Sequence, residues 1–491
     1  MTWTLLGLLV FALGFAFAVA VARRTELRRM KDTLDERAQA VRQGSDGAQL
    51  MQPVVDLSRC LGCGTCAKVC PEEGVLDLVH GQAMVVNGAR CVGHATCEKE
   101  CPVGAITVTV ANLETRRDIP ALEPNLEAVG ARGIFLAGEV TAHALIKTAI
   151  EQGAAVAREV ARRRDAGERG SGGVLDLVVV GAGPAGLACS LEAKRLGLSF
   201  ETLDQERGVG GTVAKYPRRK LVLTQPVELP LHGRLDRTSY TKEELVALWA
   251  DIARKHELPL RGGEVFHAVE RRDDGRYVVR TEAGGAYEAR HVCLALGRRG
   301  VPRRLGVPGE ELPKVAYSLL DARSYRGRRI LVVGGGDSAV EVAVGLAEQP
   351  GNEVTVSYRK ESFFRARRRE RLDAAVAEGR LTVLYGSELR AIRPDEVELE
   401  VRNGRGPKRV TLPNDDVFVM AGGVAPVEVL ERSGVSFDPS RRPAPAPVEE
   451  QGTGLVRALG AAFALALLAL AWALFHRDYY GLPTAERPVH G

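Results

Sequence analysis

A run of four cysteines constrains this chain more than any other feature of its sequence. The run reads Cys60-Leu-Gly-Cys63-Gly-Thr-Cys66-Ala-Lys-Val-Cys70-Pro71. Soft thiolates at such short intervals let one loop surround an iron–sulfur cubane, and a proline after the last cysteine is typical of these sites. A structural zinc site is the alternative, but its usual ligand spacing differs. The sequence therefore predicts an iron–sulfur module.

A second run repeats the spacing with one substitution. It reads Cys91-Val-Gly-His94-Ala-Thr-Cys97-Glu-Lys-Glu-Cys101-Pro102, with histidine where the second cysteine is expected. Together the two runs resemble the two-cluster bacterial ferredoxin module, over residues 53–110. In that family the last cysteine of each run binds the other cluster. The resemblance implies one [4Fe–4S] cluster on Cys60, Cys63, Cys66 and Cys101, and a second cluster on Cys91, Cys97, Cys70 and, at the position that departs from the family, His94.

His94 leaves the type of the second cluster open. Imidazole binds iron in Rieske centres and raises the potential there, so His94 is a candidate ligand. As a bystander it would leave a [3Fe–4S] cluster or a labile fourth iron. A chain that lacks the second cluster is the third alternative.

Length and composition narrow the class of protein. At 491 residues the chain is long enough for about three domains. Its net charge is only +5, so bulk electrostatics gives no argument for a nucleic-acid partner. Two of the nine cysteines, Cys189 and Cys293, lie outside the runs among apolar neighbours, and we expect buried thiols there rather than a disulfide. This usage fits a reducing compartment.

Two apolar stretches predict transmembrane helices. Residues 3–22 carry no charge, and about 20 helical residues cross the ~30 Å core of a bilayer. A cleaved signal peptide would need a basic start, which Met1-Thr2-Trp3 lacks. Arginines begin at Arg23, and positive residues stay cytoplasmic, so we expect the body of the chain on the cytoplasmic side of the inner membrane. The second stretch is 455–475, where a core helix is the alternative.

Two further segments predict dinucleotide-binding units. In the first, the β-branched strand Leu175–Val180 leads into Gly181-Ala-Gly183-Pro184-Ala185-Gly186 and a helix. The glycines permit a tight turn and let a pyrophosphate approach the helix N-terminus. Asp204 ends the next strand and can bond a ribose hydroxyl, and Gly210-Gly211 follows.

The second unit starts with the strand Arg329–Val333, which leads into Gly334-Gly335-Gly336-Asp337-Ser338-Ala339. After its next strand it carries Arg359 and Lys360 in place of an acidic residue. An acidic residue at this place suits a free 2′-hydroxyl, whereas basic residues suit a 2′-phosphate. The first unit therefore predicts FAD and the second NADPH, with NADH as the alternative. Arg365 is a further candidate for the phosphate, although most of the basic run 365–371 reads as a solvated helix face.

Between 174 and 438 the chain resembles the two-Rossmann flavoproteins of the thioredoxin-reductase type, which include ferredoxin–NADP reductases and bacillithiol disulfide reductases. Gly210-Gly211 resembles the pair that contacts FAD in this family. Residues 133–160 resemble the segment that closes the FAD domain, with Gly138 and Glu139 approaching FAD, but in the family that segment lies at the C-terminus. We therefore predict a permuted FAD domain in which 133–137 joins the sheet that holds 176–180.

The predicted fold is α/β, with two Rossmann-type domains, a small α+β two-cluster ferredoxin domain and two transmembrane helices. The expected parts are a transmembrane helix 1–22, a linker with a short helix 23–52, the ferredoxin module 53–110, the closing segment 111–163, a linker 164–173, the FAD domain or first Rossmann unit 174–298, the NADPH domain or second Rossmann unit 299–426, a return to the FAD domain 427–438, a linker 439–454, a transmembrane helix 455–475 and a tail 476–491.

These parts predict a membrane-anchored NAD(P)H oxidoreductase that passes electrons between NADPH, FAD and the fused clusters. Its partner, a protein or a quinone, and the direction of flow stay open, as does a homodimer. No side chain is expected to act as a general acid or base, and the linkers 297–302 and 423–426 are candidate hinges. A low-molecular-weight disulfide reductase is one alternative, although 314–321 holds no cysteine pair and Cys189 is expected to be a packed residue. A membrane redox sensor is the other.

Overall fold

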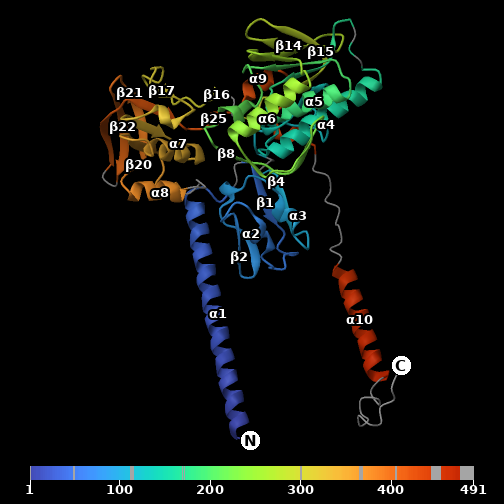
Figure 1. Cartoon of the computed structure of the whole chain (residues 1–491), viewed down its shortest axis with the longest axis vertical. Coiled ribbons are helices and arrows are strands. Elements are labelled where there is room, and N and C mark those ends of the chain that lie inside the picture. Colours follow the sequence, from blue (N-terminus) through green and yellow to red (C-terminus); the bar gives the residue numbers. More distant parts are fainter. Residues whose placement is uncertain are drawn as a thin grey trace.

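The computed structural model consists of two Rossmann units, the ferredoxin module and two projecting helices (Figure 1). The Rossmann units lie side by side, and the ferredoxin module, drawn in blue, lies below them. The residues that the structure describes are 2–47, 50–110, 115–168, 170, 172–298, 301–363, 369–403, 406–443 and 455–475.

A seven-stranded sheet forms the first Rossmann unit. Its order is β12-β7-β6-β15-β14-β13, and β5 also pairs with β15. The strand β6 pairs in parallel with β7 and β15, and its buried, mostly β-branched side chains suit this central position. The main elements are β5 (Ile134–Leu136), α4 (Ile146–Asp165), β6 (Leu175–Val180), α5 (Pro184–Arg195), β7 (Phe200–Asp204), β8 (Leu221–Leu223), β9 (Val227–Leu229), β10 (Gly233–Leu235), β11 (Ser239–Thr241), α6 (Lys242–Lys255), β12 (Leu260–Gly262), β13 (Phe266–Arg271), β14 (Tyr277–Thr281), β15 (Ala286–Leu294) and α9 (Val427–Arg432).

The strand β5 joins this sheet although it precedes the unit in sequence. Its residues Ile134–Leu136 pair in parallel with Val292–Leu294 of β15. The predicted addition of 133–137 to the sheet that holds 176–180 is therefore confirmed. The helix α4 then packs against α5 so closely that a Cβ at Gly153 would lie 1.9 Å from the carbonyl oxygen of Ala185.

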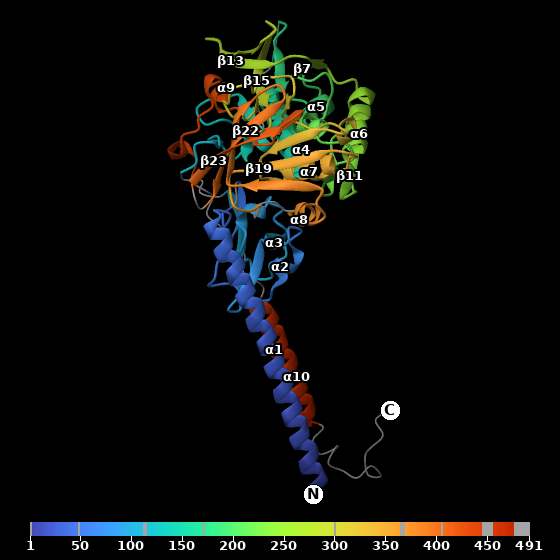
Figure 2. The same cartoon turned by 90° about the vertical axis from the view of Figure 1, so that its left-hand side faces the viewer.

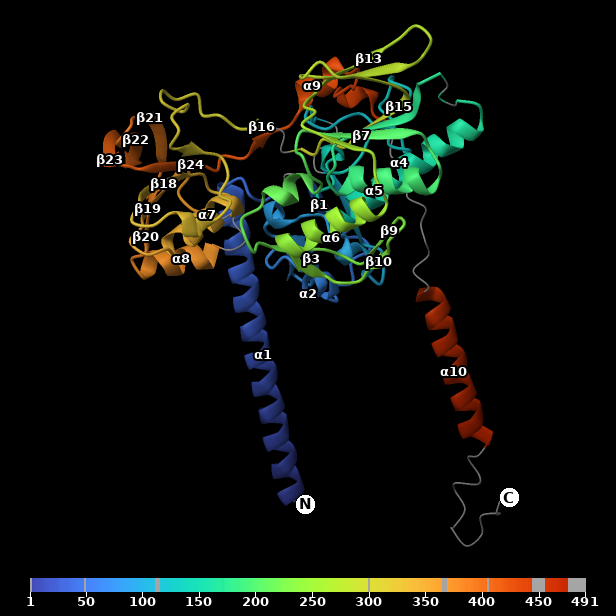
Figure 3. The same cartoon turned by 45° about the horizontal axis from the view of Figure 1, so that its top comes forward.

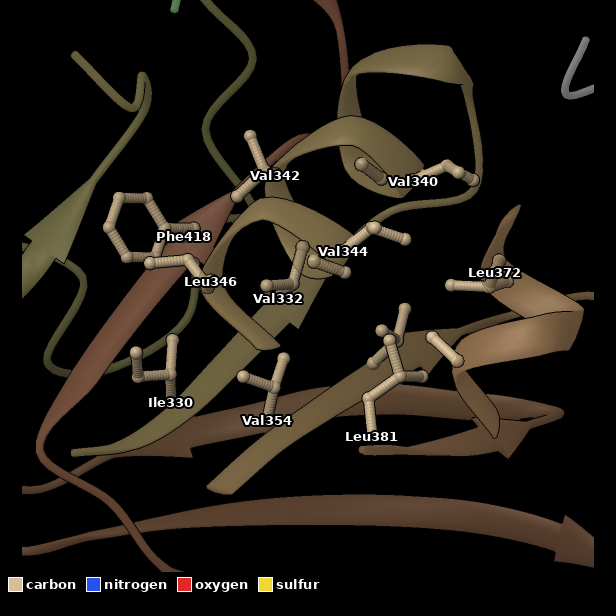
Figure 4. Close-up of a cluster of buried hydrophobic side chains, with 14 of the residues drawn as sticks. Ile330, Val332, Val340, Val342, Val344, Leu346, Val354, Leu372, Leu381 and Phe418 are labelled. Carbon is tan, nitrogen blue, oxygen red and sulfur yellow. The ribbon is translucent and has the colours of Figure 1, made fainter. Parts of the chain in front are cut away.

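The second Rossmann unit has a parallel sheet of order β17-β24-β18-β19-β20 and a separate antiparallel sheet β21-β22-β23. Figure 4 shows its core, where valines of α7 face Ile330, Val354 and Leu381 of the sheet. The elements are β16 (Val301–Pro302), β17 (Val315–Ala316), β18 (Arg329–Val333), α7 (Asp337–Ala347), β19 (Glu353–Tyr358), α8 (Arg369–Ala377), β20 (Leu381–Tyr385), β21 (Ser387–Ile392), β22 (Glu396–Asn403), β23 (Gly406–Pro413), β24 (Asp416–Val419) and β25 (Gly423–Val424).

Two short strands connect the Rossmann units (Figure 3). The strand β16 pairs antiparallel with β25, Val301 opposite Val424. These strands lie in the two linkers that we predicted as hinges. The chain therefore crosses between the units as a two-stranded ribbon.

The ferredoxin module consists of two short helices and two antiparallel strand pairs. The strand β1 (Met51–Val55) pairs with β4 (Ile106–Val110), and β2 (Leu76–Val79) pairs with β3 (Gln82–Val85). The helix α2 (Thr65–Val69) carries Cys66, and α3 (Thr96–Lys99) carries Cys97, so the two cysteine runs adopt similar local structures.

The helices α1 (Thr2–Arg42) and α10 (Leu455–Phe475) project from the same side of the body (Figure 2). The helix α1 continues without interruption through most of the segment predicted as a linker. Over the part of the chain that the structure describes, no helix combines the length and the apolar character needed to cross a membrane. The transmembrane helices predicted at 1–22 and 455–475 are therefore not supported.

Candidate functional site

The four cysteines predicted for the first cluster line one cavity. Cys60, Cys63 and Cys66 come from the first run and Cys101 from the end of the second. Apolar side chains complete the wall, among them Leu78. The exchange of last cysteines between the runs therefore brings together the set that the family resemblance implied, and four thiolates around an enclosed space suit a cubane.

Backbone geometry holds these thiols in place. Gly62 has a φ of +68°, and a Cβ there would lie 1.8 Å from the carbonyl oxygen of Gly81, so the loop between Cys60 and Cys63 closes only with glycine. The backbone N–H of Ala83 donates to Sγ of Cys60 at 3.4 Å. Hydrogen bonds of this kind to cluster sulfurs set the reduction potential.

The ionisation of the thiols reflects how closely they lie together. Burial raises the pKa of Cys66, and the charges of Cys60, Cys63 and Cys101 raise it further. A metal cluster requires deprotonated thiolates, so its binding would offset this cost. No three described residues of the ligating types lie close enough to hold a single metal ion, whereas a cubane binds each thiolate through a different iron.

The three cysteines of the second predicted set also lie close together. Burial raises the pKa of Cys97 to about 12, and the nearby charges of Cys70 and Cys91 add to the effect. His94 is half-buried in the loop before α3, at the position that Cys63 occupies in the first run. Burial raises the pKa of Cys91, and the charges of Cys70 and Glu72 raise it further, so a carboxylate that no sequence pattern indicated lies near this site. Ligation by His94 stays a prediction.

The first glycine motif forms a cradle at the carboxyl end of β6. Gly181 has a φ of +105°, and a Cβ at Gly186 would lie 1.7 Å from the carbonyl oxygen of Gly181. The helix α5 begins at Pro184, and Gly183 precedes it in an extended conformation. The loop in front of the N-terminus of α5 therefore consists of glycine backbone without bulky side chains, as binding of a pyrophosphate requires.

Three further glycines predicted for FAD gather around this cradle. A Cβ at Gly211 would lie 3.0 Å from Cα of Gly183, and the N–H of Gly210 donates to the carbonyl of Ala182 at 2.9 Å. Gly138, at the turn after β5, would place its Cβ 3.0 Å from that of Ala185. The structure thus brings the two glycine segments and the closing segment together.

Asp204 lies at the end of β7, as predicted, but its carboxylate is occupied by the backbone. One oxygen accepts from the N–H of Ala182 at 2.5 Å and the other from the N–H of Glu206 at 2.7 Å. Burial raises the pKa of Asp204. In this arrangement Asp204 fixes the glycine loop, and its bond to a ribose stays a prediction.

The second glycine motif is shaped in the same way. Gly334 has a φ of +144°, and a Cβ there would lie 2.3 Å from the carbonyl oxygen of Met420. The ring of Tyr358 covers Gly335 so closely that a Cβ would lie 2.0 Å from it. Gly336 precedes α7, whose first turn holds Asp337, Ser338 and Ala339. No pattern in the sequence indicates the ring over the loop.

The basic residues predicted for the 2′-phosphate follow β19. Arg359 is exposed, and Lys360 is half-buried. The ammonium of Lys360 donates to the carbonyl oxygen of Gln43 at 2.7 Å. Arg365 lies outside the described residues.

Two contacts between the domains were not predicted from the sequence. Nζ of Lys220, in the first Rossmann unit, lies 2.6 Å from a carboxylate oxygen of Glu341 in α7. Arg298 contacts Asp118, on the segment after the ferredoxin module, and lies near Glu139. A single sequence does not indicate which of its distant charged residues form ion pairs.

Known proteins match both parts of the chain. Residues 178–453 match the model of a family described as pyridine nucleotide-disulphide oxidoreductase, and residues 52–102 match that of a 4Fe-4S dicluster domain. A ferredoxin–NADP reductase of Thermus thermophilus is 32% identical over 275 residues, covering 54% of this chain and 78% of that protein. Bacilliredoxin reductase Bdr of Bacillus subtilis is 25% identical over 268 residues, covering 53% and 81%.

A solved structure also resembles the chain. Bacillithiol disulfide reductase of Staphylococcus aureus aligns with a TM-score of 0.46 at 23% identity, over 52% of this chain and 79% of that one.

Proposed function

Since the chain belongs to the pyridine nucleotide-disulphide oxidoreductase family and is an NAD(P)H-dependent flavin oxidoreductase with a 4Fe-4S domain, we propose that it passes electrons between NADPH, FAD and two ferredoxin clusters of its own. One observation carries the proposal. The four cysteines that line the cavity of the ferredoxin module belong to the same chain as the two glycine cradles. A donor or acceptor of single electrons is thereby built into a flavin enzyme.

The side chains and backbone have separate tasks in this scheme. The cradle of Gly181, Gly183 and Gly186 would hold the pyrophosphate of FAD, and Gly334–Gly336 would hold that of the nucleotide. Arg359 and Lys360 bind the 2′-phosphate. FAD held in the first cradle would supply the conversion of a two-electron hydride into the single electrons that iron–sulfur clusters accept. No side chain is needed as an acid or base.

Cys70, Cys91, Cys97 and His94 would hold the second cluster of the module. A ligand other than thiolate at the fourth iron changes the potential of that cluster. We propose that this cluster exchanges electrons with the external partner, a redox protein or a quinone. The direction of flow follows from the potentials of the partner and the cluster.

Disulfide reduction is the second candidate, because bacilliredoxin reductase is among the relatives. The thiol that would act is Cys189, which is fully buried on α5. The neighbouring Cys293 and burial raise its pKa well above the ordinary value. A thiol without access to solvent is a poor nucleophile, so this candidate is the weaker one; a redox sensor gains no separate support.

An anaerobic titration with NADPH, followed by absorption and EPR, tests the proposal. We expect flavin reduction first and reduced-cluster signals afterwards, and Cys63→Ser should remove the signal of one cluster. Cys189→Ser should leave NADPH oxidation with ferricyanide unchanged. The proposal would be contradicted if the flavin became reduced while the clusters stayed oxidised to the end of the titration. Purified protein with FAD but no iron would also contradict it.

We also propose a location at the cytoplasmic face of the inner membrane. Large apolar side chains are exposed on both projecting helices, for example Phe15 on α1 and Phe463 on α10. Large apolar side chains exposed in this way suit contact with lipid or protein. Fractionation of cells that express the chain with and without residues 1–22 tests the location: both forms in the soluble fraction would overturn it.

A further inference from the structure

The last turn of α1 ends in a way that leaves one carbonyl free to act as an acceptor. The N–H of Gly44 donates to the carbonyl of Val41, and the N–H of Ser45 to that of Ala40, with Gly44 at a φ of +59°. These two bonds define a Schellman motif, which satisfies earlier carbonyls of the helix. The carbonyl of Gln43 instead points out of the helix at its negative end.

This turn is fastened to the ferredoxin module. The N–H of Gly88 donates to the carbonyl of Asp46 at 3.2 Å, and that of Ala89 to the carbonyl of Ser45 at 3.0 Å. The hydroxyl of Ser45, which is fully buried, also lies 2.7 Å from the side-chain amide of Asn87. The end of α1 and the module are therefore one unit, and we call residues 43–46 the docking turn.

The docking turn contacts the second Rossmann unit through the lysine proposed for the 2′-phosphate. The ammonium of Lys360 donates to the carbonyl of Gln43 at 2.7 Å. In Figures 1 and 3 the end of α1 borders this unit. Lys360 lies two residues after β19, at the strand end where an adenine ribose is read.

We propose that the docking turn and the 2′-phosphate of NADP(H) compete for Lys360, so that the nucleotide releases the ferredoxin unit from the second Rossmann unit. The inference rests on the proposed function of Lys360. An ammonium has three N–H donors, but a phosphate beside it would face the negative end of α1, and the two repel. NAD(H) lacks this phosphate and leaves the contact in place.

Linkage gives the expected direction. If the bound nucleotide weakens docking, then loss of docking strengthens nucleotide binding by the same factor. A valine at position 44 is strained at the positive φ and displaces the carbonyl of Gln43. Gly47 is exposed with no atom within 4 Å of an added Cβ, so Gly47→Val is the matched control.

The experiment is a titration of the full-length holoprotein with NADP⁺ and, separately, with NAD⁺. We expect Gly44→Val to tighten NADP⁺ binding about fivefold, to leave NAD⁺ binding unchanged, and to differ from Gly47→Val. Ser45→Ala, which removes one fastening bond, should act in the same direction and serves if Gly44→Val does not fold. Lys360→Met should weaken the preference for NADP⁺, with Arg359 left in place.

The failures are distinguishable. If Lys360→Met weakens the preference for NADP⁺ but neither turn variant changes its affinity, the competition is wrong and the nucleotide assignment stands. If the wild-type protein shows no preference for NADP⁺, the assignment of Lys360 is wrong as well. Equal tightening of NAD⁺ and NADP⁺ would also overturn the competition.

Discussion

Arg298 binds Asp118 twice. Its guanidinium donates to the backbone carbonyl of Asp118 at 2.9 Å and also contacts the carboxylate, which Arg116 contacts at 2.6 Å. Arg298 lies where the chain leaves the first Rossmann unit, whereas Asp118 follows the ferredoxin module. One ion pair therefore joins the exit of the module to the crossing between the Rossmann units.

We expect Asp118→Ala to destabilise the protein by about 1 kcal/mol. The substitution leaves the guanidinium of Arg298, whose side chain is 15% exposed, without its carboxylate. The carboxylate itself is 43% exposed, and water screens part of the interaction. Urea unfolding followed by flavin fluorescence measures the loss. Asp273→Ala, at an exposed position, is the control, and an equal loss in both variants would refute the role of the pair.

The contact between α4 and α5 gives a prediction about FAD retention. A Cβ at Gly153 would lie 1.9 Å from the carbonyl oxygen of Ala185, which belongs to the first glycine motif. We expect Gly153→Ala to push the closing segment off α5 and to lower the FAD content of purified protein several-fold. FAD released by heat and measured by absorbance reports this content.

A second helical glycine provides the control for that experiment. Gly345 in α7 would place its Cβ 3.9 Å from that of Ala322, which is an ordinary contact. Gly345→Ala should therefore keep FAD and raise stability by up to about 1 kcal/mol through helix propensity. Full FAD content in Gly153→Ala would show that the closing segment does not shape the site.

The cysteine runs and the glycine motifs were predictable because their function depends on residues close in sequence. Spacing in a loop, a strand and a turn are local properties, and the convergence of Cys60, Cys63, Cys66 and Cys101 followed from the family resemblance. The place of β5 was predictable for a different reason: residues 133–160 resemble the closing segment, and the first unit lacked such a segment elsewhere.

The contacts between parts could not be read from the chain. The bond between Lys360 and Gln43 joins residues with no common pattern, and its acceptor is a backbone carbonyl that any residue would supply. The position of the Tyr358 ring over Gly335 depends on how β19 pairs with β18. The transmembrane prediction rested on the length and apolar composition of two stretches, and the described helices do not support it.

The loop of the first cluster gives a prediction about iron content. Gly62→Ala places a Cβ 1.8 Å from the carbonyl oxygen of Gly81 and strains a positive φ. We expect loss of about one [4Fe–4S] cluster per chain, because Cys60 and Cys63 can no longer face the same cavity. Iron and sulfide analysis measures it. Gly81→Ala strains a positive φ in the same way, but its added Cβ meets no atom within 4 Å. A similar loss of iron in Gly81→Ala would therefore show that backbone strain, and not the clash, causes the loss.

His291 makes the stability of the first Rossmann unit depend on pH. The residue is 1% exposed, and its ring nitrogens lie 3.1 Å from the carbonyl of Asp176 and 3.3 Å from the carboxylate of Glu168. Burial lowers the pKa of His291 below its ordinary 6.5, although both oxygens oppose the shift and the charge of Arg163 reinforces it. The folded protein therefore keeps this ring neutral in a range where the unfolded chain protonates it.

The sign of the effect follows from proton uptake. Between the folded pKa and 6.5 the unfolded chain binds more protons, so stability is complete above about pH 6.5 and falls as the pH drops, by up to ~1.4 kcal/mol per pH unit. His291→Gln cannot take up the proton, and we expect it to flatten the dependence between pH 5 and 6.5 while it lowers stability at pH 7.5. His267→Gln, at an exposed position, should keep the wild-type slope. Urea unfolding at several pH values measures the slope, and an unchanged slope in His291→Gln would assign it to other groups.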